Sequence, residues 1–314
     1  MNMPSFAFPP ANDRAAYAYA GVTVLIWSTV ATAFKLGLRQ ITPFELLCVA
    51  APVSFCTLFL CTLLSGRGRL LLRIPAAALL RCALLGCLNP VLYYLILFKA
   101  YDLLPAQAAQ PINYTWAIML ALLSVPLLKH RLVKGEIPAA IVSYLGVVII
   151  ALGGNADAAG PISPLGVILA LVSTLIWALY WIYGSRTQLD PLVALTAGFF
   201  FACLLLGAAL PVFSSYSAFG ELFSPAKAAA LLPAAYVGLF EMGISFFFWM
   251  KAMRLTKSAS RISMLIYFAP FLSLVFIRLV LGEPIRPATL AGLACIILGS
   301  ACQRRALRRA QNAL

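Results

Sequence analysis

The chain has 314 residues, of which 63% are hydrophobic and only 10% are charged, and it carries a formal net charge of +14. Soluble domains contain about 45–50% apolar and about 25% charged residues, so this composition excludes an ordinary soluble protein and indicates a membrane protein. The apolar residues form blocks close to the ~20 residues that a helix needs to cross a bilayer, without the alternation of a β-barrel.

Ten such blocks follow one another, and we predict that each forms a membrane-spanning helix. Helices satisfy their backbone hydrogen bonds internally, as the bilayer core demands. The first block is longer than the apolar region of a cleaved signal peptide, so we expect it to remain as a span. The fifth and tenth blocks are short. The blocks cover residues 15–36, 44–64, 77–98, 104–128, 137–153, 165–184, 191–213, 229–250, 259–281 and 288–303.

Lysine and arginine gather at alternate ends of the predicted helices. Of the 23 basic residues, 17 lie at the ends that share a side with the N-terminus. Because cytoplasmic loops carry an excess of Lys and Arg, this bias predicts a multi-pass protein of the inner (plasma) membrane with both termini cytoplasmic. The basic residues are scattered over several loops, which favours lipid over nucleic acid as the partner. The opposite ends hold only Lys35, Arg39, Lys99, Lys227, Arg278 and Arg286.

The second half of the chain repeats short words of the first half in the same order. LIW at 25–27 recurs at 175–177, and GCLN followed by FKA (86–89, 98–100) matches GLFE followed by MKA (238–241, 250–252). Each half then holds five predicted spans, and because five is odd the halves must lie in the membrane with opposite orientation. Secondary transporters use this inverted-repeat plan and bind substrate between the repeats near the midplane.

We therefore predict an all-α membrane protein of ten transmembrane helices arranged as two inverted five-helix repeats. The expected segments are a cytosolic N-terminal segment (1–14), a first repeat (15–153), an external linker (154–164), a second repeat (165–303) and a basic cytosolic tail (304–314). The sequence leaves the oligomeric state open.

Two polar residues lie near the middle of equivalent spans. Glu241 interrupts the apolar run VGLFEMGISFFFWMKA (237–252), and Asn89 is its equivalent in the first repeat. A charged side chain at the centre of a span costs ~2.5–3.5 kcal/mol on insertion, so an ionisable group there normally faces a polar cavity or a partner. The alternative is a protonated Glu with one interhelical hydrogen bond, worth about 0.6 kcal/mol.

Further polar and aromatic side chains recur at helical spacing near mid-depth. Gln107, Gln110 and Tyr114 share one helix face, and Ser260, Ser263 and Tyr267 share another. Rings at this depth usually serve packing, but several of them on spans that meet predict a cavity for an apolar or cationic group. The predicted substrate-binding residues are Trp27, Asn89, Tyr93, Gln110, Tyr114, Trp116, Trp177, Glu241 and Tyr267.

Reactive constellations do not occur in the sequence. The eight cysteines lie in or beside apolar blocks without metal-ligand spacing, and the lone histidine, His130, lies in a charged loop. The motifs GxxxxGK[ST], HExxH and GxSxG do not occur. We therefore expect no metal, no cofactor, no ATP hydrolysis and no enzymatic activity. A ten-helix channel or scaffold stays open as an alternative, and saturation and counterflow distinguish a carrier from it.

The chain also has tryptophans near the middle of the first and sixth spans, PLLKHRLVKGE after the fourth span and LVLGEPI after the ninth. These motifs resemble those of EamA-type members of the drug/metabolite transporter superfamily. QPINYTWAIML (110–120) resembles a segment of YddG-type aromatic amino-acid exporters, with Ala117 in place of a proline. His130 replaces the acid that is usual after the fourth span, and only Glu283 keeps it. The resemblance implies these cavity residues: Trp27, Tyr93, Tyr114, Trp116 and Trp177.

Together, these features predict a secondary transporter that exports a small metabolite by alternating access, with an aromatic amino acid as the first expectation. Glu241 is not part of the family pattern. It raises the alternative of a proton-coupled carrier for a cationic amine or a drug-like compound. The sequence does not specify the substrate, the direction of flux or the coupling ion.

Overall fold

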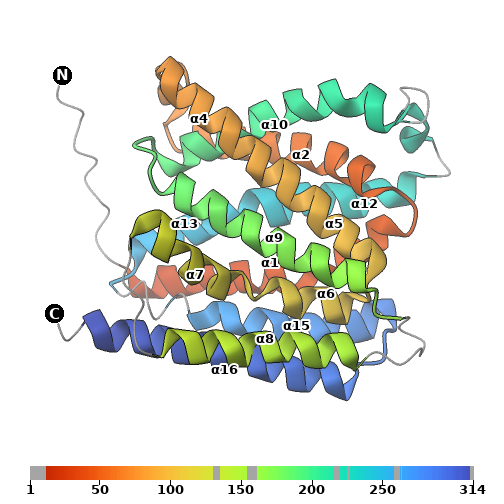
Figure 1. The fold of residues 1–314 in the computed structure, drawn as a ribbon. Coiled ribbons are helices and arrows are strands. Elements are labelled where there is room, and N and C mark those ends of the chain that lie inside the picture. Colours follow the sequence, from red (N-terminus) through yellow and green to blue (C-terminus); the bar gives the residue numbers. More distant parts are fainter. Residues whose placement is uncertain are drawn as a thin grey trace.

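The computed structural model describes residues 12–129, 135–153, 161–214, 219–224, 227–257, 262 and 264–311, and their regular elements are all helices (Figure 1). Within these ranges, eight helices are long and apolar enough to cross a membrane, judged by length and composition. Two shorter apolar helices cover Glu136–Leu152 and Leu265–Leu281. The all-helical prediction is confirmed for the described residues, and the count of ten spans depends on the two shorter helices.

Prolines and polar caps set where the helices of the first half begin. Thr42 and Glu45 form a capping box at the start of α2: the Glu45 amide donates to the Thr42 hydroxyl at 3.2 Å, and the Thr42 amide donates to the Glu45 carboxylate at 2.8 Å. The elements of this half are α1 (Asp13–Leu38), α2 (Pro43–Leu64), α3 (Gly68–Leu71), α4 (Ala76–Gly86), η1 (Cys87–Leu92), α5 (Tyr93–Leu103), α6 (Ala106–Asn113), α7 (Trp116–Leu128) and α8 (Glu136–Leu152).

The second half uses the same signals. Helices α9 and α10 each begin with a proline that follows a capping residue, and at α10 the Asp190 carboxylate accepts from the amides of Leu192 (3.0 Å) and Val193 (3.4 Å). The elements are α9 (Pro164–Gly184), α10 (Pro191–Phe213), η2 (Glu221–Phe223), α12 (Ala228–Tyr236), η3 (Val237–Ile244), α13 (Ser245–Leu255), η4 (Leu265–Phe268), α15 (Ala269–Phe276), η5 (Ile277–Leu281) and α16 (Pro287–Gln311).

The long helices run back and forth between two ends of one bundle, and α1 begins at the same end at which α16 finishes, on the left of Figure 1. At this end Asp190 forms ion pairs with Arg67 (3.4 Å) and Arg254 (3.2 Å), and the amide of Asn12 donates to the carbonyl of Leu255 at 2.9 Å. We call it the basic end. The opposite, far end carries the Lys35 ammonium, which donates to the carbonyls of Tyr101 (2.8 Å) and Leu104 (3.0 Å).

Two of the long helices are interrupted at corresponding places. The apolar helices Ala76–Leu103 and Ala228–Leu255 each contain a π-helical segment, η1 in the first and η3 in the second. Asn89 in η1 has extended backbone angles (φ −142°, ψ 117°), and Glu241 lies within η3. Segments of this kind occur frequently at functional sites. The equivalent positions of Asn89 and Glu241 thus share an irregular backbone.

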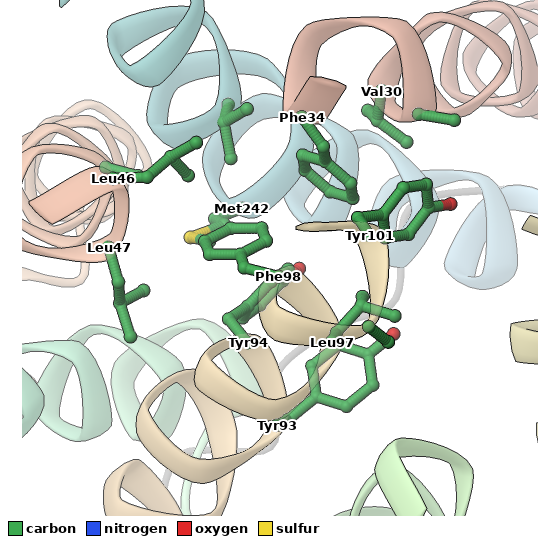
Figure 2. Packing of buried hydrophobic residues seen from close by; sticks show 14 of the residues in the cluster. Val30, Phe34, Leu46, Leu47, Tyr93, Tyr94, Leu97, Phe98, Tyr101 and Met242 are labelled. Carbon is green, nitrogen blue, oxygen red and sulfur yellow. The ribbon is translucent and has the colours of Figure 1, made fainter. Parts of the chain in front are cut away.

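A cluster of rings packs the bundle between its centre and the far end. Figure 2 shows Phe34 of α1 beside three rings of α5, with centroid distances of 4.9 Å to Phe98, 5.2 Å to Tyr101 and 6.5 Å to Tyr94. The four side chains are almost completely buried. Edge-to-face ring pairs in this distance range add to the stabilisation by burial, so the cluster holds α1 firmly against α5.

Helices α8 and α16 lie side by side along one edge of the bundle (Figure 1) and approach closely. A Cβ atom added at Gly292 would lie 2.5 Å from the carbonyl oxygen of Gly146, and one added at Gly146 would lie 2.4 Å from that of Gly292. Small residues allow such contact between membrane helices, where packing rather than water exclusion drives association. The glycines therefore set the spacing of this pair.

Candidate functional site

A cavity of about 70 Å³ lies in the centre of the bundle, and α1, α5, α6, α7, α9, η3, α13 and η4 contribute to its wall. Seven of the nine residues predicted from the sequence line it: Trp27, Tyr93, Gln110, Tyr114, Trp116, Trp177 and Glu241. The structure thus brings together side chains from distant parts of the chain. The remaining lining residues are Val30, Phe34, Leu97, Tyr101, Asn113, Phe246 and Ile266.

Trp177 contacts several of the other aromatic rings in the cavity wall. Its ring centroid lies 4.6 Å from that of Tyr93, 5.9 Å from that of Phe246 and 6.5 Å from that of Trp116. These three partners come from α5, α13 and α7, so one side chain of α9 contacts helices from both halves of the chain. Ring faces and edges lined up in this way can stack on an aromatic ligand or hold a cation by its charge.

Trp27 on α1 is held in place by α13. Its indole Nε1 donates to the Ser245 hydroxyl at 3.1 Å, and its ring lies 5.3 Å from that of Trp249. The Ser245 hydroxyl in turn donates to the backbone carbonyl of Glu241. This chain of contacts fixes the orientation of the Trp27 ring beside the irregular segment η3.

A polar network joins side chains of the cavity wall. The Tyr93 hydroxyl donates to Asn113 Oδ1 at 3.3 Å, and Asn113 Nδ2 donates to the Ser173 hydroxyl at 3.1 Å. The Tyr101 hydroxyl donates to Gln110 Oε1 at 2.5 Å. Asn113 was not among the predicted residues, although it follows Gln110 by three positions and so shares its helix face. Its helical spacing from Gln110 is the sequence signal that could have predicted Asn113 as a cavity residue.

Glu241 presents an acid to the same cavity. Its Oε1 accepts a hydrogen bond from the Tyr94 hydroxyl at 3.2 Å. Its other oxygen, Oε2, is buried and has no hydrogen-bond partner among the described residues. Buried polar atoms normally have a partner, so an unpaired carboxyl oxygen beside a cavity is suited to a ligand that donates a hydrogen bond, or to a proton.

Asn89 and Tyr267 do not line the central cavity. Asn89 lies in η1 and lines the larger cavity described below. The ring of Tyr267, in the 3-10 helix η4, lies 4.9 Å from the guanidinium carbon of Arg304 on α16. Gln107 is also turned elsewhere, because its amide nitrogen donates to the Pro284 carbonyl at 2.7 Å. Three residues considered in the sequence lie outside the described residues: His130, Ser260 and Ser263.

A second cavity of about 520 Å³ adjoins the first towards the basic end. Phe246 lines both cavities. The mouth is formed by residues where α9 ends, α10 begins and α13 ends, among them Gly184, Pro191 and Arg254. Its wall is rich in large side chains: the rings of Tyr180, Trp181 and Trp249, and the flexible side chains of Met250 and Met253.

The chemistry of the site is that of binding. Among the described residues, no group of three or more His, Cys, Asp and Glu is placed to hold a metal ion. What the central cavity offers is stacking surface, amide and hydroxyl groups, and one carboxyl. Sites of this composition orient a small molecule by a few polar contacts and bury the rest of it against apolar walls.

Comparisons with known proteins agree with this description. The profile of the EamA-like transporter family matches residues 14–152 and again residues 164–303. An uncharacterized transporter of Archaeoglobus fulgidus is 24% identical over 280 residues, which cover 88% of this chain and 94% of that protein. The uncharacterized transporter YvbV of Bacillus subtilis is 27% identical over 234 residues, 72% of each chain.

A solved crystal structure has the same fold. It superposes with a TM-score of 0.63 at 21% sequence identity and covers 94% of this chain and 98% of the other. At this level of identity the likeness concerns the fold alone. The resemblance to EamA-type transporters that the motifs indicated is confirmed by the family match over both halves.

Proposed function

Because this chain belongs to the EamA-like transporter family, we propose that it exports a small metabolite with an aromatic side chain, such as an aromatic amino acid, across the inner membrane by alternating access. A multi-pass membrane transporter follows from the family and the apolar helices. The cargo, the direction of flux and the location in the inner membrane are the proposal. It is a carrier rather than an enzyme, a channel or a scaffold.

The proposed architecture is ten spans in two inverted repeats, residues 15–153 and 165–303. Eight of these spans are the long apolar helices, and the two shorter apolar helices are the proposed fifth and ninth spans. Two observations support the repeat: the family profile matches the chain twice, and η1 and η3 interrupt equivalent helices. With an even number of spans both termini lie on one side. The excess of Lys and Arg at the basic end favours the cytoplasm for that side.

The observation that carries the proposed cargo is the ring-lined central cavity. An aromatic side chain would stack among Tyr93, Trp116 and Trp177, which already contact one another around Trp177. The polar groups of an amino acid would bond to the amides of Gln110 and Asn113, which lie on the same wall. Ring pairs are worth about 0.5–1.5 kcal/mol beyond the burial of their area, enough to favour aromatic over aliphatic cargo several-fold.

Cavity size indicates which state the structure represents. Sites for small molecules measure about 300–1,000 Å³. The central cavity of about 70 Å³ is therefore contracted, whereas the adjoining cavity of about 520 Å³ has room for a metabolite. At the far end Lys35 and Glu283 hold helices together: the Lys35 ammonium donates to the Tyr101 carbonyl, and the Glu283 carboxylate accepts from the amides of Ala106 (3.1 Å) and Gln107 (3.3 Å). We infer that cargo enters from the basic end by displacing Phe246.

A second candidate cargo is a cationic amine carried in exchange for protons. The unpartnered Oε2 of Glu241 favours it, because an ammonium group supplies the hydrogen-bond donor that this oxygen lacks. The rings of Trp27 and Trp177 line the same cavity and would attract the cation through their faces. A proton on Glu241 would then compete with the amine, which couples the two fluxes.

Counterflow in proteoliposomes tests both candidates. Vesicles that contain the purified protein are loaded with one unlabelled compound and placed in a trace of the same labelled compound, for a panel of amino acids and amines. Transient accumulation with aromatic amino acids supports the first cargo, and accumulation with amines supports the second. Flux that neither saturates nor shows counterflow would identify a channel and contradict the proposal.

A further inference from the structure

A third cavity, of about 270 Å³, lies at the basic end between the first turns of α1, the loop after α2 and the last turns of α13. It shares no lining residue with the central cavity, and it shares Met250 and Arg254 with the second cavity. Four of its eight lining residues are polar or charged, namely Ser65, Arg67, Lys251 and Arg254. The other four are Tyr19, Phe247, Met250 and Leu255, and most of the wall is apolar.

Positive charge exceeds negative charge in this cavity. Asp190 is the carboxylate paired with Arg67 (3.4 Å) and Arg254 (3.2 Å), and one of its oxygens, Oδ2, serves both. Its other oxygen accepts from the first amides of α10. One carboxylate therefore faces two guanidinium groups. The Arg67 Nε atom is buried and lies 3.4 Å from Asp190 Oδ2, and it makes no hydrogen bond there.

Lys251 adds a third cation without a carboxylate of its own. In the part of the chain that the structure describes, it takes part in no ion pair. Its ammonium instead lies 4.7 Å from the ring centroid of Phe247 and 5.4 Å from that of Tyr19. Ring faces hold the ammonium in place but do not neutralise it. Asp13, at the same end, accepts from Thr256 and the Lys257 amide and does not line the cavity.

We propose that this cavity binds the phosphate headgroup of an anionic phospholipid. Guanidinium groups match phosphate oxygens with paired donors, and lysine acts as a point charge beside them. The apolar part of the wall suits the start of an acyl chain. Basic pockets between membrane helices on the cytoplasmic side bind such headgroups, and the basic end is where the proposed topology places that side.

Native mass spectrometry tests the site with full-length protein purified in neutral detergent and freed of lipid. Phosphatidylglycerol is the probe, and zwitterionic phosphatidylcholine is its control. We expect phosphatidylglycerol to bind wild type and Lys251→Arg equally and Lys251→Gln about fivefold more weakly, the effect of one lysine near a membrane surface. Lys257→Gln removes the same charge at the same end from an exposed residue outside the cavity, and we expect it to bind like wild type.

Equal weakening by Lys251→Gln and Lys257→Gln, or equal binding of the two lipids, would overturn the proposal. Glycerol 3-phosphate distinguishes the sources of phosphate: binding that depends on Lys251 without any binding of phosphatidylglycerol would overturn the lipid assignment. Leu255→Trp fills the cavity without a change of charge and gives a second, independent test. It should reduce lipid binding even if Lys251→Gln does not fold, and undiminished binding would count against the site.

Discussion

Trp177 contacts three other rings of the central cavity and is the residue on which the proposed stacking site depends most. We expect Trp177→Ala to raise the KM for an aromatic cargo by about tenfold, since the stacking of an aromatic pair contributes about 0.5–1.5 kcal/mol in addition to the burial of its area. Trp177→Phe keeps a ring at this position and should lose much less. Counterflow measures the effect, and the thermal unfolding midpoint verifies folding. Wild-type KM in a folded Trp177→Ala would contradict the cavity as the cargo site.

Glu241 is the only Asp or Glu among the residues that line the central cavity. If protons drive transport through it, wild-type flux changes with pH because a proton and a cationic cargo compete for the carboxyl. An amine then binds less well as the pH falls and the carboxyl becomes protonated. We expect Glu241→Gln to flatten this dependence, because an amide does not titrate.

The matched control for Glu241 is Glu221→Gln, since Glu221 is exposed in η2 and lies outside the cavity. This variant should keep the pH profile of the wild type. A Glu241→Gln protein whose flux varies with pH as before would exclude proton coupling at this residue and would leave the aromatic cargo as the remaining candidate.

At the scale of elements, the close pair of α8 and α16 gives a sharp test of packing. A Cβ at Gly292 would press on the Gly146 carbonyl at 2.5 Å, whereas a Cβ at Gly207 of α10 would meet nothing within 4 Å. We expect Gly292→Ala to lower the free energy of unfolding by about 1–3 kcal/mol, as overpacking does, and Gly207→Ala to leave it unchanged or higher. Unfolding in detergent measures both. Similar free energies of unfolding for the two variants would contradict tight packing of α8 against α16.

Glu283, two residues after the ninth predicted span, caps a helix of the first half of the chain. Glu283 accepts from the first amides of α6, at Ala106 (3.1 Å) and Gln107 (3.3 Å). We expect Glu283→Ala to lower the free energy of unfolding by about 0.5–2 kcal/mol, the usual cost of a lost cap, and Glu283→Gln to lower it less because an amide oxygen still accepts. Thermal unfolding in detergent gives the measurement, with Glu221→Ala as the exposed control. Equal midpoints for all three variants would contradict the capping role.

Apolar block lengths predicted the helices well, because the need to satisfy the backbone in lipid leaves little choice. Helical spacing also brought Gln110 and Tyr114 to one wall. The prediction from helical spacing was wrong for Tyr267, because it assumes a continuous α-helix. Tyr267 lies instead in the 3-10 helix η4, and its ring lies beside Arg304. The contact between Glu283 and Ala106 could not be predicted, because the two residues are 177 positions apart and helical spacing relates only neighbours in one helix.

For the whole molecule, the proposed topology puts both chain ends on one side of the membrane. Exposed Arg14 in α1 and Arg309 in α16 mark the basic end, and exposed Glu221 follows α10 at the other end. We expect Arg14→Cys and Arg309→Cys to react with an impermeant maleimide from the cytoplasmic side and Glu221→Cys from the opposite side. The unsubstituted protein gives the background from its own exposed cysteines, Cys56 and Cys302. Labelling of Arg14→Cys and Arg309→Cys from opposite sides would contradict an even number of spans.

The small volume of the central cavity bears on how easily protons could leak through the protein. A water molecule needs at least ~10–15 Å³ of such space, so a volume of about 70 Å³ admits only a few. Phe246 bounds this small volume towards the basic end, and the rings around Phe34 bound it towards the far end. We expect so few waters to conduct protons poorly. If the protein works in the inner membrane as proposed, an idle molecule should conserve the membrane potential, worth about 2.3 kcal/mol per charge at 100 mV.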